Sequence, residues 1–213
     1  MRINWQAYLL CIIFEIFFIS FSIMIVANAT FLYQLNIRWL HLVQATGVSA
    51  DAIMADYRRV IDYLQNPLIN QLDLHSFKSS PDGIEHFRDV KRLLLFNELV
   101  ALISGVASIW SLIYNFSRNR LWQFLIPIKV MLTSLAVFVT LVLINFQSSF
   151  IMFHKLFFRN RDWVFNPNHD PIILALPIEF FLQLLLFIIG LVLIFNLILY
   201  WLGLISLRPK NKG

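Results

Sequence analysis

Four long apolar runs divide the chain and determine its expected architecture. They occupy about 7–27, 93–116, 121–147 and 178–205. A helix needs roughly 20 apolar residues to cross the hydrocarbon core of a bilayer, and each run has that length. The pattern predicts an all-α membrane protein with four transmembrane helices, in which residues 1–213 form a single integral membrane domain.

The polar segments between the runs also carry a helical pattern. They lie at about 28–92 and 148–177. Apolar residues recur at helical spacing along 50–65, at Ile53, Tyr57, Ile61 and Leu64. The Asn-Pro pair that follows should end this helix. An amphipathic helix needs a surface for its apolar face, so we expect the first insert to form a helical cap on the spans, outside the cell.

A second helix should begin inside the first insert and continue into the second span. The stretch "SSPDG" at 79–83 precedes it. Asp82 is a suitable cap, and Glu85 three residues later would complete a capping box. On this helix His86 and Asp89 are three residues apart, so they should share one face.

The distribution of basic residues favours one orientation in the membrane. Basic residues without acidic neighbours occur at the start of the chain, in the link between spans two and three, and in the tail: Arg2, Arg118, Arg120, Arg208, Lys210 and Lys212. The positive-inside rule then places both termini in the cytoplasm and both inserts outside. The 148–177 insert opposes this reading with three basic residues of its own, but the charge density of the termini and of the link between spans two and three is higher.

Composition narrows the function further. The chain is 59% hydrophobic and has a net charge of +5 with no soluble basic segment, so we expect membrane lipid rather than nucleic acid as a partner. The one cysteine, Cys11, excludes an intrachain disulfide. The first apolar run is longer than the 7–15 residues typical of a signal peptide, which favours a retained span.

Ionisable residues converge near the outer ends of three spans. With the predicted orientation, five of them reach the outer leaflet: His86, Asp89, Glu98, His154 and Glu179. Ionisable residues at membrane depth are costly and often functional. Each has a plainer explanation: the histidines could be interfacial side chains, and the glutamates could be structural partners of Lys91, Arg92 or Asn97. Glu15 lies nearer mid-membrane, where an interspan hydrogen bond would explain it.

Several familiar chemistries have no support in the sequence. There is no GxSxG elbow, no HExxH pair and no glycine-rich phosphate loop. A site of two histidines and an aspartate could hold a metal, but its spacing lacks the motif typical of zinc. We therefore expect no metal and no cofactor, with histidine and carboxylate performing any chemistry.

Two segments resemble the signatures of a known family. "GIEHFRDVKRLL" (83–94) resembles the first motif of the small membrane proteins of Gram-positive bacteria that include the lipoprotein intramolecular transacylase. "FIMFHKLFFRNRDWVFNPNHDPIILALPIEFF" (150–181) resembles the second, with a histidine among phenylalanines, an Asn-x-x-Trp ending at Trp163, and Asp170. "DYRRVIDYLQNP" resembles the family's extracellular helix that contains a tyrosine, here Tyr57.

The resemblance implies an acyltransferase of the cell membrane that acts on diacylglyceryl-modified lipoproteins. The sn-2 acyl chain would move to the α-amine of the N-terminal cysteine and leave an N-acyl lyso-form. The two motif histidines fall on His86 and His154. Supporting or substrate-binding positions fall on Glu85, Tyr57, Glu98, Trp163, Asp170 and Glu179.

The residue chemistry suits this reaction and leaves alternatives open. Attack on an ester needs a neutral amine, and imidazole is a suitable base for it. His86 could take the proton with Asp89 orienting it, while His154 could protonate the leaving oxygen or stabilise the oxyanion. An acyl-histidine intermediate is a second route. The alternative function is a non-enzymatic membrane scaffold or immunity-type partner protein, which the two histidines facing different sides would favour.

Overall fold

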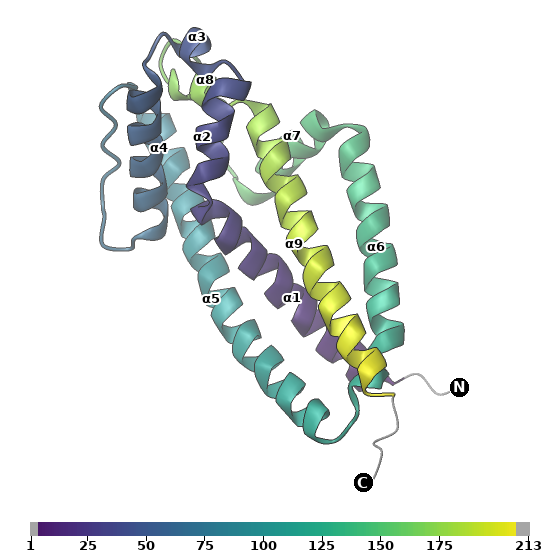
Figure 1. Cartoon of the computed structure of the whole chain (residues 1–213). Helices are drawn as coiled ribbons and strands as arrows, with labels where there is room; N and C mark the ends of the chain where they lie inside the picture. Colours follow the sequence, from purple (N-terminus) through teal and green to yellow (C-terminus); the bar gives the residue numbers. More distant parts are fainter. Residues whose placement is uncertain (1–3, 208–213) are drawn as a thin grey trace. The chain divides into compact units, whose positions relative to one another are not determined.

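The computed structural model describes residues 4–207, and in this part of the chain all regular structure is helical. The elements are α1 (Trp5–Asn28), α2 (Thr30–Trp39), α3 (Leu42–Thr46), α4 (Ala50–Gln65), α5 (Pro81–Ser117), η1 (Leu121–Phe124), α6 (Leu125–Ile144), α7 (Phe146–Phe157), α8 (Ile172–Ala175) and α9 (Ile178–Ile205) (Figure 1). Arg2, Arg208, Lys210 and Lys212, on which the predicted orientation partly rests, lie outside the described residues.

Four helical segments are long and apolar enough to cross a membrane, as the sequence predicts. They are Trp5–Asn28, Pro81–Ser117, Leu121–Ile144 and Ile178–Ile205. The all-α class and the four spans are therefore confirmed. The helix of the second span begins well before its apolar run, because it includes the polar turns that carry His86.

The described chain divides into two compact units. The membrane unit contains residues 4–24, 98–144 and 186–207. Its core packs aromatic and aliphatic side chains of α1, η1, α6 and α9, including Phe14, Phe124 and Val192. Phe14 meets Phe124 edge to face, with ring centroids 5.6 Å apart. Glu15 of this unit interacts with Asn196, which matches the interspan partner expected of it.

The cap unit contains residues 25–97 and 145–185. The predicted helix over 50–65 is confirmed as α4, which Ser49 caps by accepting a hydrogen bond from the amide of Ala52. Its apolar stripe enters the core of the unit, where the rings of Tyr57 and Tyr33 stack with centroids 3.7 Å apart. The hydroxyl of Tyr33 donates to the carbonyl of Ala175 at 2.8 Å. These contacts join α2, α4 and α8 around one core.

Two predicted boundaries were wrong, and each has a local cause. The third span ends at Ile144 rather than 147, because Asn145 leaves the helical conformation and caps α7 by accepting from the amide of Ser148 at 3.0 Å. The capping box of Asp82 and Glu85 does not form. α5 begins at Pro81, whose fixed φ suits the first helical position, and the Ser80 hydroxyl accepts from the amide of Gly83 at 3.0 Å.

Candidate active site

The cap unit brings the two motif histidines together. His86 lies in the second turn of α5 and His154 near the end of α7. The two side chains are nearly buried, with 9% of each residue exposed, and their ring centroids are 5.8 Å apart. They therefore face one another, which removes the main sequence argument for a scaffold.

Aromatic rings surround both imidazoles. His86 packs edge to face with Phe158 and Phe165, at ring-centroid distances of 4.9 Å and 5.4 Å. Around His154 lie Phe150 at 4.3 Å and Trp163 at 5.0 Å. Phe150, His154 and Phe158 recur every four residues, so α7 and its C-cap present them on one face. The two rings therefore lie in a largely apolar setting.

A backbone hydrogen bond determines the tautomer of His154. Its Nδ1 lies 2.7 Å from the carbonyl oxygen of Phe150. A carbonyl only accepts, so Nδ1 carries the hydrogen and Nε2 of the neutral ring is left with a lone pair. Burial lowers the pKa of His154 below its usual value, and the Phe150 carbonyl only partly opposes this effect. His154 is therefore a neutral ring with an available basic nitrogen at neutral pH.

Two buried nitrogen atoms in this cluster have no hydrogen-bond partner among the described residues. They are Nδ1 of His86 and Nε1 of Trp163. Most buried polar atoms in folded proteins are paired, and an unpaired one costs about 1–3 kcal/mol. Unpaired polar atoms beside His154 are what a site for a polar substrate group would contain.

Two hydrogen-bonded tethers hold the segment after α7 against the start of α5. The side-chain nitrogen of Asn160 donates to Oδ2 of Asp89 at 3.0 Å. Ten residues later, the buried Asp170 carboxylate accepts from the Ser80 amide and the Ser80 hydroxyl, both at 2.7 Å. Trp163 lies between these attachment points, so the tethers fix the chain that carries it. We call residues 158–171 the tethered loop.

Asp89 contacts groups other than the one expected of it. Its second oxygen accepts from Arg92 at 2.9 Å, and no hydrogen bond joins it to His86 within residues 4–207. Helical spacing places Asp89 and His86 on neighbouring positions, but it does not select the hydrogen-bond partner. The pairing of Asp89 with Asn160, 71 residues away, had no signal in the sequence beyond the presence of both residues in the two motifs.

The other predicted residues are spread over different environments. Glu85 pairs with Arg88 and, at 3.8 Å, with Arg92 on the outer face of α5. Tyr57 belongs to the cap core, where burial raises its pKa to about 12, so its hydroxyl stays protonated. Glu179 is exposed in the first turn of α9. Glu98 belongs to the membrane unit.

No cluster of three or more histidine, cysteine, aspartate or glutamate side chains suited to a metal occurs between residues 4 and 207. The chemistry available to the described cluster is that of two imidazoles, one indole and the tethering carboxylates.

Comparisons with known proteins agree with this arrangement. The family model described as "Lipoprotein intramolecular transacylase Lit" matches residues 8–181. A solved structure of the membrane integral lipoprotein intramolecular transacylase Lit from Bacillus cereus is 28% identical, with a TM-score of 0.86 over 98% of this chain and 97% of that chain.

Two structures of variants of the Bacillus cereus protein also match. One carries a histidine-to-arginine mutation, with 29% identity and a TM-score of 0.78 over 94% of this chain and 90% of that one. The other carries a histidine-to-alanine mutation, with 28% identity and a TM-score of 0.81 over 98% and 95%. No curated protein matches the chain.

Proposed function

This chain belongs to the lipoprotein intramolecular transacylase family, and from that membership we propose how its residues perform the acyl transfer. It is an integral membrane acyltransferase. The substrate is a lipoprotein whose N-terminal cysteine carries a diacylglyceryl group. The sn-2 acyl chain moves to the α-amine of that cysteine and leaves an N-acyl lyso-form lipoprotein.

His154 is the base in this proposal. Its Nδ1 donates to Phe150, which leaves the lone pair of Nε2 free to accept a proton from the α-amine. This fixed tautomer is the observation that carries the proposal. It reverses the roles expected from the sequence, where His86 took the proton, because the carboxylate expected to orient His86 is bonded to Arg92 and Asn160 instead.

His86 passes the proton on to the leaving group. The amine attacks the ester carbonyl, its proton passes to His154, and a tetrahedral intermediate forms. His86 then accepts this proton from His154 and gives it to the glyceryl oxygen as the bond to the carbonyl carbon breaks, so both imidazoles end neutral and the reaction consumes no net proton. The 5.8 Å between the two ring centroids allows one substrate group to lie against both rings. Direct attack needs no acyl-histidine, and an acyl-imidazole intermediate is the alternative route.

Asp89 and Asp170 are positioning residues in this scheme. Both carboxylates hold the tethered loop to α5, and neither is hydrogen-bonded to an imidazole. Tyr57 supports the cap core from which α5 and α9 lead into their spans. Glu85, Glu98 and Glu179 are left as candidates for substrate contact.

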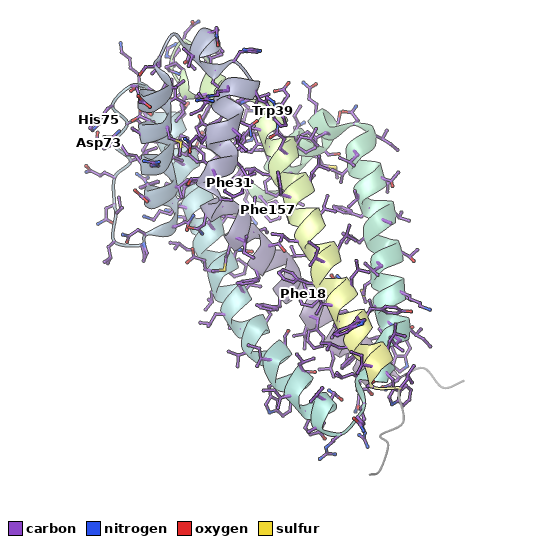
Figure 2. All side chains as sticks on the ribbon, in the orientation of Figure 1. Phe18, Phe31, Trp39, Asp73, His75 and Phe157 are labelled. Carbon is purple, nitrogen blue, oxygen red and sulfur yellow. The ribbon has the colours of Figure 1, made fainter. Side chains whose placement is uncertain are left out.

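Exposed apolar faces support a site at the lipid surface. α2 and α7 each bury one face and expose the other, and their exposed apolar residues include Phe31, Leu35, Trp39, Met152, Leu156 and Phe157 (three of them labelled in Figure 2). Helices of this kind lie in the membrane interface. We propose that the site faces the outer leaflet, with both termini in the cytoplasm and the whole chain acting as a single integral membrane domain.

Cysteine labelling in intact cells tests this topology. Asn168→Cys should react with an impermeant maleimide before lysis, and Ser117→Cys, on the opposite side of the second span, only after lysis. The native Cys11 is 2% exposed and should give little background. The reverse labelling pattern would refute the proposed orientation.

Mass spectrometry of a reporter lipopeptide tests the histidines. His86→Ala and His154→Ala should each lower the rate of transfer on the order of 10²-fold or more, the usual contribution of a general acid or base. The double variant should lose little more, since residues that act as a unit fail together. His41→Ala is the matched control, because that histidine is exposed and precedes α3, outside the aromatic cluster. Normal transfer by either single variant would remove that histidine from the mechanism.

A further inference from the structure

The acyl transfer needs a hydrogen-bond donor that Nε2 of neutral His154 does not provide at the start of the reaction. Negative charge develops on the ester carbonyl oxygen when the amine attacks, and donors aimed at that oxygen are a major source of catalysis. Nε2 of neutral His154 is an acceptor, because its Nδ1 carries the hydrogen. The remaining neighbours of the His154 ring are Phe150, Phe153, Phe158, His86 and Trp163.

Trp163 is the member of this set with a donor and no acceptor capacity. Its indole N–H is buried and has no partner among the described residues, and its ring centroid lies 5.0 Å from that of His154. Indole nitrogen only donates, so the group that satisfies it must be an acceptor. An ester carbonyl held beside His154 is such an acceptor, and it is the atom on which the charge develops.

The backbone around Trp163 is fixed in advance. The amide of Val164 donates to the carbonyl of Arg161 at 3.0 Å, forming a turn that carries the tryptophan. Asn160, at the base of this turn, donates to Asp89 and accepts from the amide of Asp162 at 3.4 Å. A donor held in this way needs little reorganisation during the reaction, which is the condition for efficient stabilisation of the transition state.

We propose that the indole N–H of Trp163 donates a hydrogen bond to the acyl ester carbonyl oxygen and stabilises the oxyanion of the tetrahedral intermediate. This inference rests on the proposed function of His154. The N–H keeps its proton throughout: the new bond joins the amine nitrogen to the carbonyl carbon, the broken bond releases the glyceryl oxygen, and the transferred proton moves through the imidazoles. Trp163 is therefore a catalytic residue rather than part of the aromatic packing.

Kinetics of the purified full-length enzyme on a synthetic diacylglyceryl lipopeptide in mixed micelles test the proposal. Two variants remove the N–H: Trp163→Phe, and replacement of Trp163 by benzothienylalanine, which keeps the two-ring shape. Both should lower kcat on the order of 10²-fold, as loss of one oxyanion donor does, while KM changes little. The matched control is Trp39→Phe, which alters an exposed tryptophan of the same unit and should keep the wild-type rate.

The outcomes separate a catalytic N–H from ring packing. Full activity with benzothienylalanine and a loss with phenylalanine would mean that only the shape of the ring matters, and the proposal would be wrong. Unchanged kcat in both variants would also overturn it. If those variants are active while His154→Ala is inactive, this inference fails and the proposed function holds. If His154→Ala is active, the proposed function itself fails. Thermal denaturation of each variant shows whether a lost rate reflects unfolding.

Discussion

A methyl group added at Gly83 should release the tethered loop. Gly83 lies in the first turn of α5, directly against Asp170. A Cβ built there would overlap Oδ1 of Asp170 and come 3.0 Å from its Cγ. The aspartate side chain is short and held by Ser80, so it cannot turn aside while keeping its hydrogen bonds. Gly83→Ala should therefore break the tether at Asp170.

The magnitude follows from two opposed effects. Replacing glycine by alanine inside a helix is favourable by about 1 kcal/mol. The tether consists of two hydrogen bonds to a carboxylate, and bonds to charged groups contribute about 1.5–3 kcal/mol each. If both are lost, the net cost is about 2–5 kcal/mol. Since about 1.4 kcal/mol corresponds to a factor of ten, the closed loop should become at least ~30-fold less populated relative to the open one.

Conversion of a reporter lipopeptide, followed by mass spectrometry, measures the consequence. Gly83→Ala should lower the transfer rate at least ~10-fold, because Trp163 and Phe165 are carried by the released segment. Gly190→Ala is the matched control, since a Cβ there meets no atom within 4 Å. It should leave activity unchanged and, by helix propensity, should not lower the melting temperature.

A double variant makes the reasoning refutable. In an Asp170→Ala background the overlapping carboxylate is absent, so adding Gly83→Ala should cost nothing further. The two substitutions should therefore be strongly non-additive, as expected for residues in contact. A Gly83→Ala enzyme with full activity and an unchanged or higher melting temperature would show that the tether does not hold the loop in place.

Three further predictions concern pH, the second tether and the depth of the site. Burial lowers the pKa of His154 below its usual value of about 6.5, so this base is neutral throughout the range in which the substrate amine, with a pKa near 7.7–8.0, loses its proton. The rising limb of kcat/KM should therefore have its midpoint near the pKa of the amine, and a midpoint below pH 7 would contradict the role of His154. Asp89→Asn and Asn160→Ala should give partial defects of similar size that do not add in the double variant, measured by lipopeptide conversion, whereas independent defects would argue against a shared hydrogen bond. Glu15→Gln should keep most activity at normal expression, and a complete loss of transfer in the folded variant would mean that the chemistry lies deeper in the membrane.

The pattern of apolar residues predicted the four spans and α4, because burial in lipid and burial in the cap core both require apolar side chains at regular positions. Four runs of about 20 apolar residues leave a helix as the only economical way to satisfy the backbone in hydrocarbon. The stripe from Ile53 to Leu64 marks the buried face of α4 in the same way, and its ends follow from Ser49 and the Asn66-Pro67 pair. Local chemistry was sufficient in both cases, because each helix and its boundaries involve residues close in sequence.

The partners within the site could not be read from the same pattern. Spacing places His86 and Asp89 on one face of α5. The Asp89 carboxylate nevertheless accepts its hydrogen bond from Asn160 of the tethered loop. In the same way, the start of α5 at Pro81 depends on Ser80. Its hydroxyl accepts a hydrogen bond from the amide of Gly83 and donates one to the carboxylate of Asp170. Contacts 71 and 90 residues apart in sequence decide these partners, and periodicity holds no information about them.

The intramolecular nature of the reaction changes what the aromatic surroundings must do. The amine and the ester belong to one substrate, and well-oriented groups of this kind can reach effective concentrations of about 10⁵–10⁸ M, far above that of liquid water. In a correctly oriented substrate the ester would thus react with the amine of the same molecule even where some water enters. The rings of Phe150, Phe158 and Phe165 are consequently needed less as a barrier to hydrolysis than for keeping the imidazoles neutral. Phe158→Ala should on this argument raise the pKa of His154 toward the ordinary value of about 6.5. Transfer should then fall more steeply below about pH 6.5 than in the wild type, while the midpoint near the pKa of the amine and the ratio of transferred to hydrolysed acyl chain stay unchanged. A large rise in free fatty acid from this variant, with the pH profile unchanged, would instead show that the rings act mainly as a barrier to hydrolysis.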